Sequence, residues 1–289
     1  MNDAENFFSK KGAIMKFTKM EGLGNDYVYV NAFIEKVENP GELARRIADR
    51  HFGVGGDGLI LIEPSDKADA YMHMFNADGS EGSMCGNGIR CVAKYIYDHG
   101  IVEKERRQLH IETKSGIKDI EIFVKDGKME KATVDMGEVK LDGKLPEDIE
   151  VRGMALQFVG IDVGNPHAVY FLEDNPNLSV SSISELDLER IGKDFEEHPR
   201  FPNKVNAEFI QVLSPTEISF RVYERGSGET LACGTGATAA VVAGILMGRL
   251  EDKATVHLLG GDLEISYDKK TGHAFMTGPA REVFSGEWI

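Results

Sequence analysis

Short stretches rich in β-branched and aromatic residues alternate with turn residues along most of this chain. Stretches of this kind, bounded nearby by Gly, Asn, Asp or Pro, predict β-strands. The four clearest cover Asp26–Phe33, Lys118–Lys125, Glu217–Tyr223 and Leu263–Tyr267. Helical patterns are few. One predicted helix covers Pro40–Arg50, with Asn39 as its N-cap and Pro40 at the first helical position.

Two further helical patterns follow glycine-rich segments. After Gly86, apolar residues recur at helical spacing as far as Ile96, and Gly100 provides a stop. After Gly234, nearly every residue as far as Leu246 is small or apolar. This second pattern predicts a helix that is buried on almost all sides, as it would be inside a curled sheet.

The two halves of the chain resemble each other. Phe75–Cys85 ends a predicted strand and opens the first of these helices, and Tyr223–Cys233 does the same for the second, 148 positions later (233 − 85). The pairs Gly24-Asn25 and Gly164-Asn165 stand earlier in each half, 140 positions apart (164 − 24). Similar elements at a nearly constant offset indicate a duplicated domain, with a boundary near residues 126–131. Two such domains facing each other would place one cysteine on either side of a shared cleft.

Composition and charge exclude several classes of function. The formal net charge of −15 over 289 residues argues against nucleic-acid partners and anionic membranes, because both need clustered Lys and Arg. No apolar run approaches the roughly 20 residues of a transmembrane helix. Three cysteines, an odd and low number, favour a reducing compartment, so we expect a cytoplasmic protein. Residues 1–14 are polar, do not resemble a secretory signal, and are interpreted as an N-terminal extension.

The segments Cys85-Gly-Asn-Gly and Cys233-Gly-Thr-Gly combine a thiol with a helix start. Free backbone N–H groups at a helix N-terminus favour a substrate carboxylate or a thiolate, and glycines let a ligand approach the backbone. Such surroundings can lower the pKa of a thiol from about 8.5 to roughly 3.5–7.5. Two opposed thiols are what stereoinversion at carbon requires, since one removes the α-proton and the other delivers a proton to the opposite face.

Other interpretations of these residues are weaker. Cys91 lies inside the predicted helix and is interpreted as a small core residue. Neither a Cys-x2-Cys pair nor a nearby His pair is present, so we expect no metal site. Neither glycine-rich loop has the Lys and Ser/Thr of a phosphate-binding P-loop.

Several motifs, in family order and spanning nearly the whole chain from Met15, resemble the diaminopimelate epimerase family. They are Lys19–Asp26 (KMEGLGND), Phe75–Ser80 (FNADGS), Cys85–Cys91 (CGNGIRC), Gly164–His167 (GNPH), Tyr223–Gly226 (YERG) and Ala232–Ala237 (ACGTGA). Proline racemases and 4-hydroxyproline epimerases also use two cysteines, but they typically carry His where this chain has Asn87 and lack the Asn-Ala-Asp-Gly-Ser run. The related phenazine-biosynthesis isomerases lack the paired cysteines.

The resemblance implies an α+β fold of two pseudo-symmetric domains, each a mixed β-sheet wrapped around a central helix. The first would cover residues 15–131, with 278–289 returning to it, and the second residues 132–277. It also implies conversion of LL-2,6-diaminopimelate to the meso isomer in lysine and peptidoglycan precursor biosynthesis. The family needs neither pyridoxal phosphate nor a metal, so no cofactor is expected, and it often forms homodimers.

The resemblance also implies roles for individual residues. Cys85 and Cys233 would be the catalytic pair, and His167 and Glu224 would help set their protonation states. The substrate would be held by Asn25, Asn76, Gly86, Asn87, Asn165, Asn206, Glu224, Arg225, Gly234 and Thr235. Some family members place Gln where this chain has Gly58, so that contact with the substrate would be absent here or supplied otherwise.

Two alternatives stay open at this point. One is a two-cysteine racemase acting on proline or hydroxyproline, although proline has no distal carboxylate for Arg225 to hold. The other is a ligand-binding protein with this fold and no catalysis. Exchange of the substrate α-hydrogen with solvent deuterium would distinguish that protein from any enzyme.

Overall fold

A computed structural model of the protein describes residues 14–289, so the extension expected over residues 1–14 lies outside the described part except for Ile14. The helices are α1 (Pro40–Ile47), α2 (Gly86–Asp98), α3 (Leu188–Glu196) and α4 (Gly234–Leu246), with short 3-10 helices η1 (Leu172–Asp174), η2 (Pro176–Leu178) and η3 (Ile183–Glu185). The strands of the first half are β1 (Met15–Gly22), β2 (Asn25–Asn31), β3 (Gly58–Glu63), β4 (Ala70–Asn76), β5 (Gln108–Thr113), β6 (Gly116–Lys125) and β7 (Lys128–Glu138). The remaining strands are β8 (Lys140–Leu141), β9 (Glu147–Val151), β10 (Met154–Asp162), β11 (Pro166–Phe171), β12 (Asn206–Ser214), β13 (Glu217–Glu224), β14 (Gly228–Glu229), β15 (Lys253–Leu258), β16 (Gly261–Asp268), β17 (His273–Pro279) and β18 (Arg281–Trp288).

Strand pairing repeats itself between the two halves. In the first half β1 to β7 pair in chain order, and β2–β3 and β4–β5 are the parallel pairs. In the second half β10, β11, β12, β13, β15, β16 and β17 pair in the same way, with β11–β12 and β13–β15 parallel. α2 follows β4 and α4 follows β13, which are equivalent strands. The predicted pair of pseudo-symmetric domains with mixed sheets is therefore confirmed.

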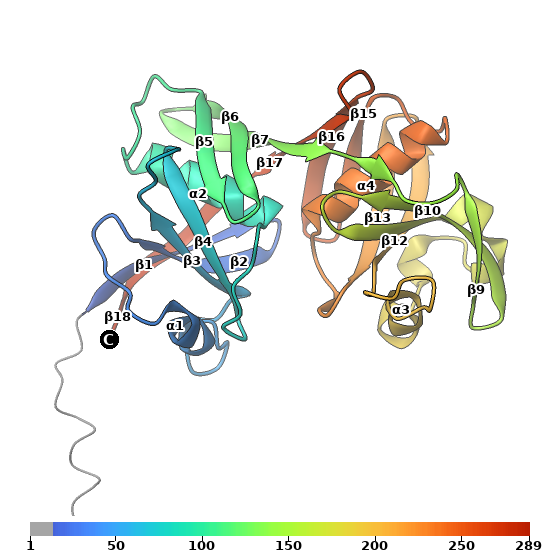
Figure 1. Ribbon diagram of the computed structural model, residues 1–289, viewed down its shortest axis with the longest axis horizontal. Helices are drawn as coiled ribbons and strands as arrows, with labels where there is room; N and C mark the ends of the chain where they lie inside the picture. Colours follow the sequence, from blue (N-terminus) through green and yellow to red (C-terminus); the bar gives the residue numbers. More distant parts are fainter. Residues whose placement is uncertain (1–13) are drawn as a thin grey trace, which may run out of the picture.

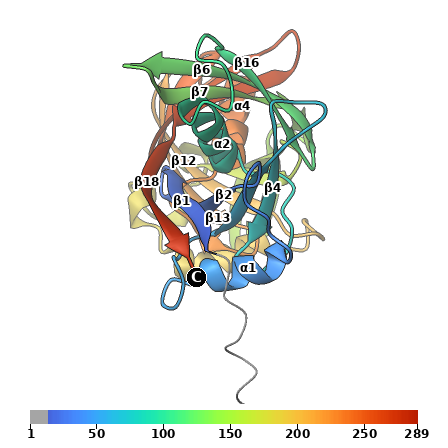
Figure 2. The same ribbon diagram turned by 90° about the vertical axis from the view of Figure 1, so that its left-hand side faces the viewer.

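Each half encloses one helix (Figure 1). α2 packs against β1, β2, β4, β5 and β7, and in Figure 2 it lies inside these strands. α4 packs against β10, β11, β12, β15, β16 and β17. The residues of α4 are almost all Ala, Val, Gly or Ile, and from Gly236 to Ile245 they are all buried. Because small side chains let strands approach a helix from every side, this composition explains how the sheet can close around it.

The equivalent strands β7 and β17 pair with each other and join the two halves. Thr133 lies opposite Thr277, and their hydroxyl oxygens are 2.7 Å apart. The last strand, β18, returns to pair with β1. The range 126–131, where the sequence suggested a boundary, covers the turn after β6 and the start of β7, and β7 still pairs with β6. The chain reaches the second half along β7 (Figure 1).

The first helix differs from its prediction. It ends at Ile47 instead of Arg50, and the side chain of Asn39 forms no capping hydrogen bond. Arg50 instead reaches two carboxylates, with Nη2 2.7 Å from Asp26 Oδ1 and 3.0 Å from Asp57 Oδ1. Periodicity could not predict this end, because the competing interactions come from β2 and from the loop before β3.

Candidate functional site

Cys85 and Cys233 occupy equivalent positions at the starts of the two enclosed helices. Each is the N-cap residue in extended conformation, with φ of −136° and −121°. The Cys85 sulfur accepts a hydrogen bond from Gly88 N at 3.3 Å, and the Cys233 sulfur accepts one from Gly236 N at 3.4 Å. A thiol thus takes the capping role that Ser or Asp usually performs, which directs both sulfurs toward free helix N–H groups.

The two helix N-termini meet across the junction of the halves. Asn87 Nδ2 donates to the carbonyl of Ala232 at 3.3 Å, which links the first turn of α2 to the residue before Cys233. Met276 of β17 lies between the helices. A Cβ on Gly86 would be 2.8 Å from its Cε, and one on Gly234 2.8 Å from its Sδ. A side chain at either glycine would therefore displace the end of the Met276 side chain.

On the first side, a hydrogen-bonded chain leads from the thiol to a carboxylate. The Cys85 thiol donates to Asn25 Oδ1 at 3.2 Å, and Asn25 Nδ2 donates to Asp57 Oδ2 at 2.7 Å. Asp57 also accepts from Arg50, yet burial raises the pKa of its carboxyl group. Tyr27 is buried beside Cys85, and burial raises the pKa of its phenol.

On the second side, a longer series of polar contacts likewise leads from the thiol to a carboxyl group. The Cys233 sulfur lies 3.6 Å from Thr235 Oγ1, which accepts from Asn165 Nδ2 at 3.4 Å. Asn165 Oδ1 is 3.0 Å from His167 Nε2, and His167 Nδ1 is 2.6 Å from Glu208 Oε1. Because an amide oxygen only accepts, His167 Nε2 is the donor to Asn165 and carries a proton. Burial raises the pKa of Glu208 to about 7, while the neighbouring His167 opposes that rise.

The electrostatic environments of the two thiols differ. Burial raises the pKa of Cys85, and the helix N–H groups and Arg90 oppose this. Burial, Glu224 and Glu208 together raise the pKa of Cys233 well above its ordinary value. The expectation that the helix N-termini lower these pKa values is therefore wrong for this structure, because desolvation of the thiolate outweighs the few N–H donors.

The expected substrate ligands of the second half lie together at the ends of β12 and β13. Asn206 Oδ1 accepts from the backbone N of Arg225 at 2.9 Å, and Asn206 Nδ2 donates to Pro166 O at 3.0 Å. Glu224 accepts from the hydroxyl of Thr230. The guanidinium of Arg225 is exposed, with Nη1 3.3 Å from the carbonyl of Asn203.

In the first half, Asn76 ends β4 and donates to Ser80 Oγ at 3.0 Å within the loop that leads to Cys85. The resemblance to the family implied a Gln in some members where this chain has Gly58, and the surroundings of Gly58 are crowded. A Cβ on Gly58 would lie 2.0 Å from the carbonyl oxygen of Phe75 and 2.9 Å from the ring of Tyr27. Position 58 therefore has no room for a glutamine side chain in this structure.

Sequence reasoning missed four residues of this region: Asp57, Arg90, Glu208 and Thr230. Arg90 and Glu208 had a signal, because each is a charged residue inside a segment that is otherwise buried and apolar. Asp57 and Thr230 had none, since each lies in a loop and becomes relevant only through contacts with Asn25 and Glu224. Within residues 14–289, no group of three or more His, Cys, Asp or Glu side chains is arranged to hold a metal ion.

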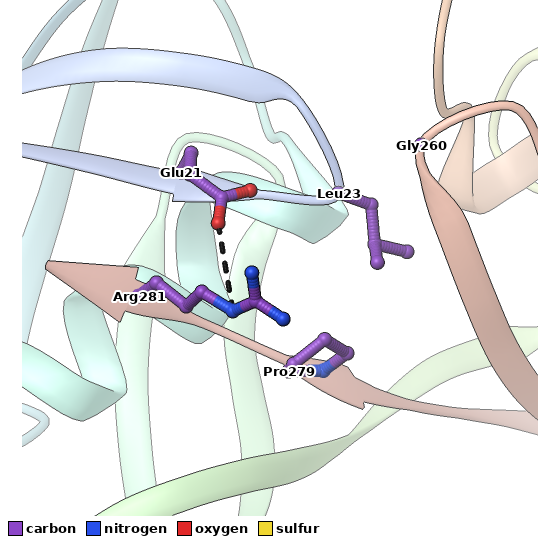
Figure 3. Close-up of a pocket in the computed structure, with 5 residues that line it drawn as sticks. All are labelled: Glu21, Leu23, Gly260, Pro279 and Arg281. Atoms are coloured by element: carbon purple, nitrogen blue, oxygen red, sulfur yellow. Dashed lines mark ion pairs between the residues drawn. The ribbon is translucent and has the colours of Figure 1, made fainter. Parts of the chain in front are cut away.

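A small pocket lies at the junction between the halves (Figure 3). Glu21 and Leu23 line it from the first half and Gly260 from the second, with Pro279 and Arg281 at the passage from β17 to β18. Arg281 Nε lies 3.8 Å from Glu21 Oε1. A Cβ on Gly260 would be 1.9 Å from the carbonyl oxygen of Leu23, so the two halves touch here through their backbones.

Comparison with known proteins identifies close relatives. The profile of the family described as diaminopimelate epimerase matches residues 17–141 and 159–283. The diaminopimelate epimerase of Acetivibrio thermocellus is 50% identical over 284 residues, covering 94% of this chain and 98% of the relative. That of Desulfovibrio desulfuricans is 48% identical over 291 residues, covering 95% and 98%. The solved structure of a probable proline racemase from Agrobacterium radiobacter has a TM-score of 0.74 at 17% identity, covering 95% of this chain and 93% of that one. At that identity, the likeness shows a shared fold.

Proposed function

This chain belongs to the diaminopimelate epimerase family, and on that premise we propose that Cys85 and Cys233 exchange a proton with the substrate α-carbon. The protein is an isomerase that converts LL-2,6-diaminopimelate to the meso isomer, a step of lysine biosynthesis. The observation that carries the assignment of the two thiols is their equivalent placement as N-caps of α2 and α4, on opposite sides of one junction.

The proposed reaction transfers one proton in each direction. One cysteine, as thiolate, takes the α-proton, and the electron pair of the broken C–H bond delocalises into the α-carboxylate. The other cysteine, as thiol, gives its proton to the opposite face and becomes the thiolate. The carboxylate would sit between the starts of α2 and α4, where Gly86, Asn87, Gly234 and Thr235 offer helix-terminal donors. The reaction needs neither an oxidant nor a reductant, and no cofactor is included in this scheme.

Supporting groups surround each thiol. His167 and Glu224 would influence the protonation of the cysteines without touching the reacting carbon. In support, Glu224 raises the pKa of both thiols, and His167 belongs to the series of hydrogen bonds that links Cys233 to Glu208.

The remaining polar residues suit the distal end of the substrate. Amide donors and acceptors for the amino and carboxylate groups of the substrate come from four asparagines, namely Asn25, Asn76, Asn165 and Asn206. Arg225 has its guanidinium in solvent and could hold the distal carboxylate through two parallel hydrogen bonds.

The alternative substrates, proline and hydroxyproline, are less well supported. The resemblance to a probable proline racemase rests on the fold at 17% identity, whereas relatives at 48–50% identity over nearly the whole chain are diaminopimelate epimerases. Arg225 also favours a substrate with a distal carboxylate, which proline lacks, and Asn87 stands where the proline enzymes typically carry His.

We further propose that the protein acts as a homodimer in the cytoplasm. No helix within residues 14–289 is long and apolar enough to cross a membrane. Among those residues β18 pairs with β1 alone, and Val283 and Phe284 on it are 56% and 48% exposed. Beside it lies a cleft of about 400 Å³ between β1, β18 and the end of α2. An open strand edge with exposed apolar side chains suits pairing with a second copy. Sedimentation of the wild type against Phe284→Lys tests this, and a wild-type monomer would contradict it.

Proton NMR of LL-diaminopimelate in deuterium oxide tests the proposed chemistry. The wild type should incorporate deuterium at one α-carbon as the meso isomer forms, and Cys85→Ala and Cys233→Ala should both lose epimerisation. If proline exchanges its α-hydrogen for deuterium while diaminopimelate is untouched, the two-thiol chemistry stands and the assignment of diaminopimelate as substrate is refuted. If neither amino acid exchanges, the protein binds without catalysis and the two thiols have another role.

A further inference from the structure

Arg90 is a buried cation that forms no salt bridge with any residue of the range 14–289. Its side chain is 0% exposed and is among the largest fully buried side chains of the protein. Its guanidinium donates to Gly86 O at 3.1 Å, Asn87 Oδ1 at 3.0 Å and Pro279 O at 3.1 Å, and it lies 3.6 Å from Met276 Sδ. All four partners are uncharged. An arginine stays protonated in proteins, so a full positive charge is held in the interior, where only these hydrogen bonds offset the cost of desolvation.

Arg90 differs from the residue at the equivalent position of the other half. Arg90 follows Cys85 by five residues, and Thr238 follows Cys233 by five residues. Both satisfy the same backbone carbonyl of their helix, since Arg90 Nη1 bonds Gly86 O and Thr238 Oγ1 bonds Gly234 O at 2.9 Å. A hydroxyl is thus sufficient for that structural task. The charge of Arg90 is the feature that the duplication does not repeat.

The second half instead places a carboxyl group behind its thiol. A Cβ on Gly236 would lie 2.8 Å from Glu208 Oε1, so this carboxyl group sits directly beneath the start of α4. One Glu208 oxygen is buried without a hydrogen-bond partner among the described residues. Two carboxyl groups, Glu208 and Glu224, therefore act on Cys233, whereas Glu224 and the cation Arg90 act on Cys85.

From this arrangement we propose that Arg90 is a positioning residue for the epimerisation. It makes the two duplicated thiol sites unequal by placing a positive charge behind Cys85 and by fixing the side chain of Asn87. The proposal rests on the proposed function, in which both thiols and Asn87 meet the substrate. Its consequence is that Cys85 is the more acidic of the two thiols in the free enzyme, so a thiolate forms there first.

Hydrogen bonds connect the Arg90 guanidinium to Asn87, which is one of the proposed substrate ligands. Arg90 Nη2 holds Asn87 Oδ1, which leaves Asn87 Nδ2 free to donate to Ala232 O across the junction. Through Pro279, which lines the pocket of Figure 3, the same guanidinium is tied to the end of the strand that joins the halves. The other titratable groups acting on Cys85 or Arg90 are Tyr27, Tyr29, Cys91, Glu21 and Glu224.

The test measures the pH at which each thiol becomes reactive. Iodoacetamide alkylation is followed by mass spectrometry, and the pH midpoint of the rate is used because it does not depend on accessibility. In the wild type, the Cys85 midpoint should lie at least one pH unit below that of Cys233. In a chain with Cys91→Ala and Cys233→Ala, Arg90→Met should raise the Cys85 midpoint by about one unit. Arg90→Lys, which keeps the charge, should restore most of the difference.

A matched control is Thr238→Val, which removes the bond to Gly234 O without changing charge. It should leave the Cys85 midpoint unchanged. An unmoved midpoint in folded Arg90→Met overturns the proposal. If Arg90→Met does not fold, equal midpoints for the two thiols of the wild type overturn it instead. Diaminopimelate turnover by the wild type is measured separately, so a failure of the proposed function is not confused with a failure of this inference.

Discussion

The buried Glu208–His167 pair makes a prediction about stability and pH. Glu208 is fully buried, its Oε1 is 2.6 Å from His167 Nδ1, and its pKa is raised to about 7 from 4.5 by burial. Between about pH 4.5 and pH 7 the folded protein therefore keeps a proton that the unfolded chain has lost. The free energy of unfolding must fall as the pH rises through that range.

The size of this effect follows from the two pKa values. One pKa unit corresponds to about 1.4 kcal/mol, so a rise from 4.5 to about 7 makes Glu208 cost about 3 kcal/mol of stability once it is ionised. Most of that loss, about 2–3 kcal/mol, falls between about pH 5 and pH 8. Glu208→Gln has nearly the same shape and can keep a hydrogen bond to His167, but it cannot ionise.

Urea unfolding at a series of pH values measures the difference. The stability of Glu208→Gln relative to the wild type should rise by about 2–3 kcal/mol from about pH 5 to pH 8, with equal m-values. Every other titrating group is common to both proteins, so the difference isolates the Glu208–His167 pair. Parallel stability curves would show that Glu208 is ionised throughout, and the account of its burial would be wrong.

Three further predictions test separate parts of the site. Cys91→Ala should keep full epimerase activity and lose about 1–2 kcal/mol of stability, because Cys91 is a buried core residue; loss of activity would contradict its structural role. Gly260→Ala should lower stability by about 1–3 kcal/mol and reduce kcat/KM, because its Cβ would press on the Leu23 carbonyl; an unchanged Tm would show that the halves separate freely there. Arg225→Lys should raise KM for diaminopimelate by about tenfold or more with a smaller change in kcat, since an ammonium cannot form the two-point contact; an unchanged KM would place the distal carboxylate elsewhere.

Much of the architecture was predictable because the chain repeats itself. The similar offsets of the Gly-Asn pairs and the cysteines indicated duplication, and the apolar stretch after Gly234 indicated a helix enclosed by strands. Both features depend on local sequence, since glycine before a helix and small residues along it have direct conformational consequences. Helix ends were less predictable, as the early end of α1 shows, because they depend on partners from elsewhere in the chain.

The charges behind the thiols were harder to predict for a physical reason. A helix N-terminus is visible in the sequence, but the desolvation that opposes it depends on how completely the sheet closes around the helix. Arg90 and Glu208 stand in apolar segments, so their burial could be suspected, yet the sign of their effect on a given thiol depends on the fold. The pairing of Glu208 with His167 joins neighbouring strands, β12 and β11, whose order in the sheet sequence alone does not give.

The difference between the two halves has a consequence that thermodynamics constrains. Each turnover protonates the cysteine that began as the thiolate and leaves its partner as the thiolate. A proton must therefore move back between the two cysteines before the enzyme can act again in the same direction. A charge such as Arg90, which favours one protonation state, favours binding of the isomer whose α-hydrogen faces Cys85. It cannot change the equilibrium between the isomers, because a catalyst lowers the barrier equally for both directions. Arg90→Met must therefore change kcat/KM by the same factor in the two directions at any one pH, while kcat and KM separately shift in opposite senses for LL- and meso-diaminopimelate. A variant that altered the individual constants equally in both directions would show that Arg90 supports the fold of the site and does not polarise it.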